Sequence, residues 1–117
     1  MYGLKPEDIR FLEHLRGEGI IQIAVGEFQV QFQTGSGVIS VEGRCELFDA
    51  ENRLVDFWDR GARSNDFRFF ELLGKTIDGI SVDTDGSFVA TFEGGAKLRV
   101  IDNSDKYESF SVGNLFV

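Results

Sequence analysis

Two short stretches and one side chain of this sequence have residue types associated with catalysis or ligand binding: Asp83-Thr84-Asp85-Gly86, Gly35-Ser36-Gly37 and His14. The first begins like a calcium-binding loop, but the last position of such a loop needs a carboxylate and is Gly94 here. The Gly-Ser-Gly stretch lacks the helix and the Lys-Ser/Thr pair of a phosphate-binding loop. Because both stretches lie between alternating segments, we predict two hairpin turns.

The remaining reactive groups do not form a catalytic or metal-binding set. His14, the only histidine, lies in a predicted helix beside Glu13 with no cysteine nearby. Cys45, the only cysteine, lies in the alternating stretch Arg44-Cys45-Glu46-Leu47-Phe48, which favours a buried structural thiol. Carboxylates are numerous, but no spacing singles out an acid–base pair. We therefore predict that the protein is not an enzyme and binds neither a metal nor a cofactor.

The composition is that of one globular domain, residues 1–117, that avoids nucleic acid and membranes. The chain has 12 Lys and Arg against 20 Asp and Glu, a net charge of −8, and 12 Phe to supply core material. A phosphate backbone or an anionic membrane would repel this charge, whereas a basic protein would be attracted. The charged N-terminal stretch has no long apolar run, which predicts a cytoplasmic protein without a signal peptide or membrane span.

The N-terminal region, residues 1–17, is predicted to form a helix over 6–16. Pro6 suits the first helical position and Gly17 suits the end. Apolar residues recur at helical spacing between them, which gives the helix one face to bury.

The segment 18–58 is predicted to hold the first meander and a hairpin. Residues 20–25, 28–33 and 38–41 alternate apolar and polar side chains between glycine-bearing turns. A hairpin follows over 47–55, with its turn at 49–52. Residues 59–74 are then predicted to be a polar loop and a short helix that Gly74 ends, with Phe69, Leu72 and Leu73 on one face.

The segment 75–117 repeats this pattern. Residues 77–82 match 20–25, Phe88-x-Ala90-x-Phe92 matches Phe28-x-Val30-x-Phe32, and 98–100 match 39–41. Even Tyr107-Glu108-Ser109-Phe110 echoes Cys45-Glu46-Leu47-Phe48. We predict an α+β but mainly β fold. It consists of two duplicated antiparallel β-meanders packed as a sandwich or partly open barrel, with an N-terminal helix and a short helix between the halves.

Acidic and aromatic residues concentrate between the two meanders, which predicts a partner-binding surface there. Trp and Arg are over-represented among residues that dominate interface energetics. In a strand, Trp58 would share one face with Asp56, and Phe57 would share the other with Asp59, so that either ring could point to solvent. The predicted partner-binding residues are Asp49, Glu51, Asp56, Trp58, Asp59 and Arg60.

Five short motifs within residues 20–112 resemble the pattern of a family of small, acidic, β-rich bacterial proteins. They are Phe28-Gln29-Val30-Gln31-Phe32, Leu72-Leu73-Gly74-Lys75, Asp85-Gly86, Phe92-Glu93-Gly94-Gly95 and Tyr107-Glu108-Ser109-Phe110. Members of that family are similar to immunity proteins found beside secreted bacterial toxins. The resemblance implies a binding role without naming a site.

These observations lead to one functional hypothesis and two alternatives. The first is an immunity-type inhibitor that binds and neutralises a cognate bacterial toxin, with a basic, nuclease-like domain as its expected partner. The second is a small-molecule-binding domain or sensor with a pocket lined by Phe28, Phe32, Phe88 and Phe92. The third is a homodimeric structural subunit in which Trp58 and the short helix meet their copy.

Overall fold

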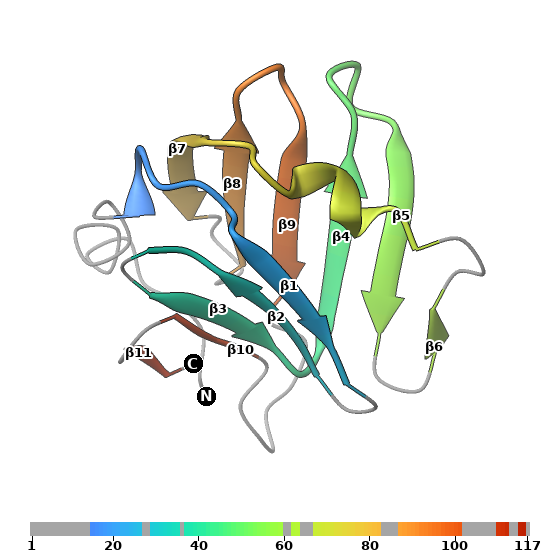
Figure 1. The fold of residues 1–117 in the computed structure, drawn as a ribbon. Coiled ribbons are helices and arrows are strands. Elements are labelled where there is room, and N and C mark those ends of the chain that lie inside the picture. The colour runs from blue at the N-terminus through green and yellow to red at the C-terminus, as the bar shows by residue number, and fades with distance from the viewer. Residues whose placement is uncertain are drawn as a thin grey trace.

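The computed structural model describes residues 15–26, 29–35, 37–59, 62–63, 67–82, 87–101, 110–112 and 115–116, and these form two antiparallel sheets packed face to face (Figure 1). The first sheet has five strands in the order β1-β2-β3-β10-β11. Their bounds are β1 Gln22–Val25, β2 Val30–Gln33, β3 Val38–Val41, β10 Phe110–Val112 and β11 Leu115–Phe116.

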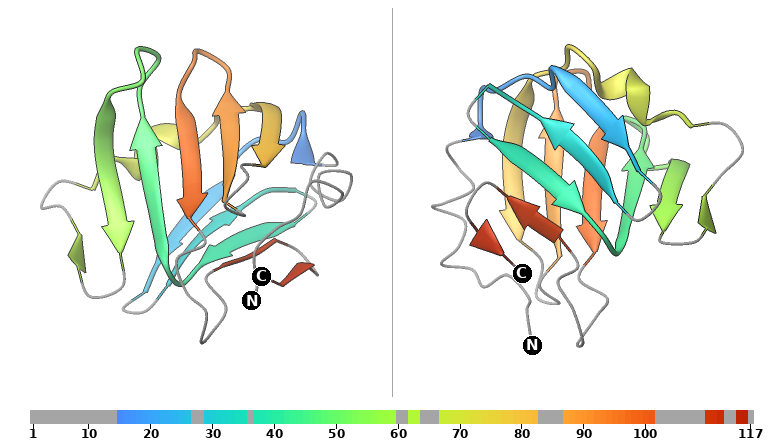
Figure 2. Two further views of the ribbon diagram at one scale, coloured as in Figure 1. Left: turned by 180° about the vertical axis from the view of Figure 1, so that it is seen from behind. Right: turned by 60° about the horizontal axis from the view of Figure 1, so that its bottom comes forward.

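The second sheet has six strands in the order β6-β5-β4-β9-β8-β7. Their bounds are β4 Arg44–Phe48, β5 Leu54–Asp59, β6 Ala62–Arg63, β7 Ile77–Val82, β8 Phe88–Phe92 and β9 Lys97–Ile101. In the right-hand view of Figure 2 the five-stranded sheet lies over the six-stranded one. No helix within the described ranges is long and apolar enough to cross a membrane.

Both predicted meanders are present, and each is completed by the other half of the chain. Strands β1, β2 and β3 are neighbours in one sheet, and β7, β8 and β9 are neighbours in the other. After β3 the chain crosses over, so that β4 pairs with β9, and after β9 it crosses back, so that β10 pairs with β3. The mainly β sandwich is therefore confirmed, and neither sheet closes into a barrel.

The register of the two meanders differs from the predicted alignment. Val25 pairs with Val30 in the first meander, and Val82 pairs with Phe88 in the second. Val30 therefore corresponds to Phe88, whereas the matched Phe-x-x-x-Phe patterns had placed Phe28 there. The predicted match was wrong by two residues. It still put the correct residues inside, because side chains alternate between the faces with a period of two.

One core joins the inner faces of both sheets. Residues at alternate positions of the strands are buried, as the period of two predicts. The largest side chains of this core are Trp58, Phe32, Phe88 and Phe92 from the strands and Phe69 from the segment between β6 and β7. Three of the four phenylalanines predicted to line a ligand pocket thus fill the core instead, and the fourth, Phe28, lies outside the described residues.

Of the two predicted helices, the N-terminal one lies almost wholly outside the described residues, and the short one needs correction. Of the N-terminal helix over 6–16, only Leu15 and Arg16 fall within the described chain. They lie at a turn in which the Glu18 N–H donates to the Leu15 carbonyl at 2.9 Å. The described residues contain no α-helix.

The short helix between the halves is the 3₁₀ helix η3, Phe69–Leu72. Phe69 and Leu72 are buried, but Leu73 is exposed, contrary to the prediction. The reason is the helix type: side chains three residues apart eclipse in a 3₁₀ helix, and an α-helical spacing had been assumed. Gly74 follows with a positive φ of 81°, in agreement with its predicted role as a helix stop.

The turns predicted from glycine motifs have different outcomes. The 35–37 turn joins β2 to β3, where the Thr34 N–H donates to the Gly37 carbonyl at 2.8 Å. The Asp83–Gly86 turn falls outside the described residues. The hairpin with its turn at 49–52 joins β4 to β5 as predicted.

Candidate functional site

The predicted partner-binding residues are divided between the inside and the outside of β5. Trp58 and Asp56 are 1% and 2% exposed, so neither offers surface to a partner. Phe57 and Asp59 lie on the opposite, half-buried side of the strand. Of the two orientations left open by the sequence, the structure has the one with Trp58 inside. Arg60 lies outside the described residues.

Asp56 has a structural role in this arrangement. Its carboxylate accepts the Phe57 N–H at 2.8 Å and the Arg68 N–H at 2.6 Å. A buried carboxylate needs such donors to offset the loss of water. Asp56 therefore fastens the segment that leads into η3 to the inner side of β5.

Asp49 and Glu51 lie in the β4–β5 turn. The Asp49 carboxylate accepts the N–H groups of Glu51 and Arg53, both at 2.9 Å, and the Arg53 Nε at 3.2 Å. These bonds, the Arg53 N–H foremost, hold the pKa of Asp49 below its usual value. Asp49 thus shapes the turn, which Asn52 completes with a φ of 64°. Among the predicted partner-binding residues that the structure describes, only Glu51, whose side chain is 66% exposed, is largely available to a partner.

The outer face of the six-stranded sheet, the sheet nearer to the viewer at the left of Figure 2, carries a cluster that the sequence analysis did not single out. Arg44 lies over the Phe57 ring with its Cζ 4.7 Å from the ring centroid. Its guanidinium also contacts the Glu46 carboxylate at 3.0 Å and the Asp59 carboxylate at 3.4 Å. Arg99 approaches Glu46 at 3.9 Å from the neighbouring strand. We name this cluster the arginine–aromatic face: Arg44, Glu46, Phe48, Phe57, Asp59 and Arg99.

The signal for this cluster was present in the sequence. The alternation of Arg44-Cys45-Glu46-Leu47-Phe48 predicts that Cys45 is buried. By the same argument it places Arg44, Glu46 and Phe48 on the outer side of the strand. Cross-strand pairing then sets Arg44 opposite Asp59 and Glu46 opposite Phe57. That pairing is the part that the sequence pattern did not contain.

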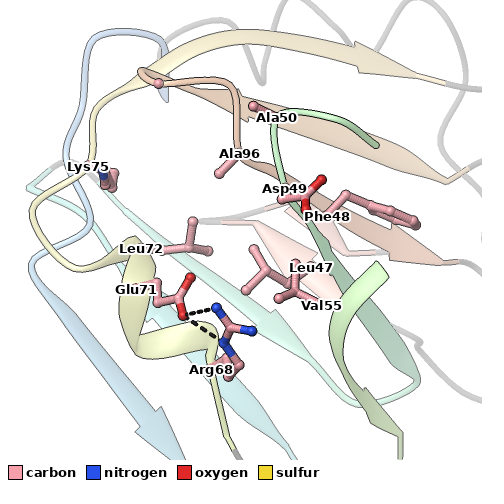
Figure 3. A pocket seen from close by; sticks show the side chains of 11 residues that line it. Leu47, Phe48, Asp49, Ala50, Val55, Arg68, Glu71, Leu72, Lys75 and Ala96 are labelled. Carbon is pink, nitrogen blue, oxygen red and sulfur yellow. Dashed lines mark hydrogen bonds and ion pairs between the residues drawn. The ribbon is translucent and has the colours of Figure 1, made fainter. Parts of the chain in front are cut away.

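Two depressions flank the arginine–aromatic face. A shallow one of about 270 Å³ is lined by Phe48, Asn52, Val89, Lys97 and Arg99, and the Lys97 Nζ donates to the Asn52 Oδ1 across it at 2.8 Å. A larger one of about 520 Å³ opens at the end of the sandwich, between η3, the β4–β5 hairpin and the β8–β9 turn (Figure 3).

Within the described residues the Cys45 thiol is buried, and the acidic side chains show no metal-binding arrangement. Burial raises the pKa of the Cys45 thiol far above its usual range, and the Asp56 carboxylate adds to this effect, so the nucleophilic thiolate is disfavoured. The predicted buried structural thiol is thereby confirmed. No group of three or more His, Cys, Asp or Glu side chains among these residues is arranged to hold a metal ion.

Comparisons with family models, with curated proteins and with solved structures gave no match. A rigid sheet that presents arginine, two aromatic rings and paired carboxylates is chemically suited to binding another surface.

Proposed function

We propose that this protein is a non-catalytic binding protein that holds another protein on its arginine–aromatic face, as an immunity-type inhibitor holds a cognate bacterial toxin. The observation that carries the proposal is Arg44, stacked on Phe57 at 4.7 Å and held by two carboxylates. Arginine and aromatic side chains dominate the binding energy of many interfaces. The resemblance to immunity proteins supports the more specific part, and the predicted cytoplasmic location is part of the same proposal.

Preorganisation favours the arginine–aromatic face over Asp49 and Glu51 of the β4–β5 hairpin as the binding surface. The Arg44 guanidinium is fixed before binding by Glu46, Asp59 and the ring beneath it. A side chain that is already ordered loses less conformational entropy when a partner arrives. The cluster also lies on β-strands, which position side chains more rigidly than loops do.

The expected charge of the partner depends on the net charge of this protein at long range and on the paired charges of the face at contact. The net charge of −8 attracts a basic protein from a distance, as the sequence analysis expects. At contact, however, the face presents both signs, and Asp49 and Asp59 are already paired with arginines. We therefore propose a basic partner whose contact surface carries acidic as well as basic groups.

The direct test is coexpression with the products of the neighbouring genes, followed by size-exclusion chromatography and measurement of the Kd. We expect a stable complex, loss of toxicity in a growth assay, and about 30-fold weaker binding for Arg44→Ala or Phe57→Ser, the effect of a typical hot spot. Gln31→Ala, on the opposite outer face, is the matched control and should bind within about twofold of the unchanged chain. No complex with any neighbouring product would contradict the toxin part of the proposal.

Two further measurements separate the remaining alternatives. The association rate should fall as salt is added if long-range charge steers the encounter. Light scattering of the protein alone should give the mass of one 13.1 kDa chain. Twice that mass, abolished by Phe57→Ser, would show that this face binds a second copy instead.

A further inference from the structure

The larger depression has the size and position of a small-molecule site. Its volume of about 520 Å³ falls within the range of roughly 300–1,000 Å³ that is usual for ligand pockets. It is lined by residues of β4, β5, η3 and the β8–β9 turn (Figure 3). It is separate from the contacts that define the arginine–aromatic face, although Phe48 borders both.

The floor of this pocket is apolar. Leu47 and Leu72 are buried members of the core and reach the pocket from β4 and η3, and Val55 and Ala96 lie half-buried beside them. Figure 3 shows Leu47, Val55 and Leu72 pointing into the same space. A hydrocarbon chain or ring placed there would leave water and cover the exposed parts of Val55 and Ala96, whereas Leu47 and Leu72 are already out of water.

One wall of the pocket is already fixed. The β4–β5 and β8–β9 turns are in close contact at Gly95 and Ala50. A Cβ added to Gly95 would lie only 2.7 Å from the Cβ of Ala50. Gly95 also has a φ of 99°, which other residues rarely adopt. The contact between the turns therefore exists before any ligand binds, so closing this wall costs a ligand little.

Most charged groups on the rim of the pocket already have a partner, and one lysine is the exception among the described residues. Asp49 is bonded within its own turn, and Arg68 and Glu71 form an ion pair at 2.7 Å. Lys75 also lines the pocket, with its Nζ close to Gly94 in the β8–β9 turn. Among the residues that the structure describes, the Lys75 ammonium has neither an ion pair nor a hydrogen bond. An anionic group at the rim would meet this charge and no unpaired carboxylate.

We propose that this pocket binds a small amphiphilic anion, with its hydrocarbon part on the Leu47–Leu72 floor and its carboxylate at Lys75. The apolar floor predicts a hydrocarbon body for the ligand, and the unpaired Lys75 ammonium predicts a negatively charged head group. This site does not rest on the proposed protein-binding function, and it shares Phe48 with that face. The ligand is defined here only as a monocarboxylate with a short hydrocarbon chain.

Octanoate is a suitable probe, and the neutral octanamide is its matched control. Calorimetric titration of the full chain should show saturable binding of octanoate. Lys75→Gln should weaken octanoate binding by about threefold to fivefold, the contribution of one exposed ion pair, and leave octanamide binding unchanged. Lys97→Gln removes the same charge on the outer face of the sheet and should leave both affinities unchanged.

A second variant tests the position of the hydrocarbon. Ala96→Leu places extra side-chain volume in the pocket and should weaken both ligands by at least about tenfold, since their apolar part is displaced. Circular dichroism would verify that each variant is folded. The proposal is overturned by non-saturable octanoate binding, by equal effects of Lys75→Gln and Lys97→Gln, or by a folded Ala96→Leu protein with unchanged affinity.

Discussion

The two outer faces of the sandwich differ in chemistry although the strands beneath them are built alike. The six-stranded sheet presents the arginine–aromatic face, in which Arg44 is paired with two carboxylates and lies over the Phe57 ring. On the five-stranded sheet, the described outer side chains of β1, β2 and β3 are uncharged; they are Gln22, Ala24, Gln31, Gln33, Val38 and Ser40, which we name the glutamine face. In a chain with a net charge of −8, an uncharged face is as distinctive as a charged one.

The inner faces of the same sheets do not differ in this way. Both consist of aliphatic and aromatic side chains that share one core, because burial selects apolar groups wherever a strand faces inward. The outer faces are free of that requirement. The fold therefore does not require the difference between them.

The largest expected effect on the free energy of unfolding distinguishes an inner from an outer side chain of β5. Trp58→Ala should lower the free energy of unfolding by about 3–5 kcal/mol, because it leaves a cavity beside Cys45, its neighbour across the strands. Phe57→Ala, one residue away on the outer face, should cost about 1 kcal/mol, the loss of its contact with Arg44. Urea unfolding followed by circular dichroism measures both. Equal losses would show that the outer face is also needed for folding.

The next effect concerns Asp56, the charged exception on an inner face. Asp56→Ala should cost about 2 kcal/mol or more, because the N–H groups of Phe57 and Arg68 would lose their acceptor in a buried place. Asp59→Ala, the corresponding change on the outer face, removes only a half-exposed ion pair with Arg44 and should cost less than about 1 kcal/mol. A small loss for Asp56→Ala would mean that water replaces the carboxylate.

Sequence periodicity was sufficient to predict which side of each strand is buried but not which strands are neighbours. A shift of two residues leaves every side chain on the same face, and for this reason Phe28 was matched to Phe88 when the pairing matches Val30 to it. The crossing of β4 to β9 and of β10 to β3 depends on contacts between distant segments, which no local pattern contains.

The same distinction explains the outcome for the candidate site. Charge and aromatic content near β5 drew attention to the correct region. Trp58 was nevertheless placed among the partner-binding residues, because the pattern in β5 fits either orientation. Cross-strand contacts then assembled Arg44, Phe57 and Asp59 from two strands. The apolar floor of the pocket likewise combines β4 with η3, whose 3₁₀ geometry the sequence analysis did not predict.

A smaller effect distinguishes the turns of the two sheets by their response to pH. The β4–β5 turn is held by hydrogen bonds to the Asp49 carboxylate, which can be protonated as pH falls. The β2–β3 turn is held by the Thr34 hydroxyl, which does not change its charge on acidification. The folded pKa of Asp49 is depressed, so its contribution to stability is present above the unfolded pKa and is lost as pH falls through the folded one.

Asp49→Asn should therefore be less stable than the unchanged chain at neutral pH, and the difference should shrink as the solution is acidified. Urea unfolding at a series of pH values measures it. Glu51→Gln, in the same turn but exposed, is the control and should show a smaller change. A difference for Asp49→Asn that does not depend on pH would mean that shape rather than charge matters at this position.

The smallest expected effect tests whether the glutamine face has a function of its own. Gln31 lies between Ala24 and Ser40 on the neighbouring strands, so Gln31→Lys brings no charge next to another on that face. The free energy of unfolding should change by less than about 0.5 kcal/mol, and the affinity for the protein partner should be unchanged. Circular dichroism and the Kd of the complex measure these two quantities. If Gln31→Lys instead weakened the complex as much as Arg44→Ala, the functional contrast between the two faces would be wrong, because an uncharged surface that excludes water in a complex cannot accept an ammonium without loss.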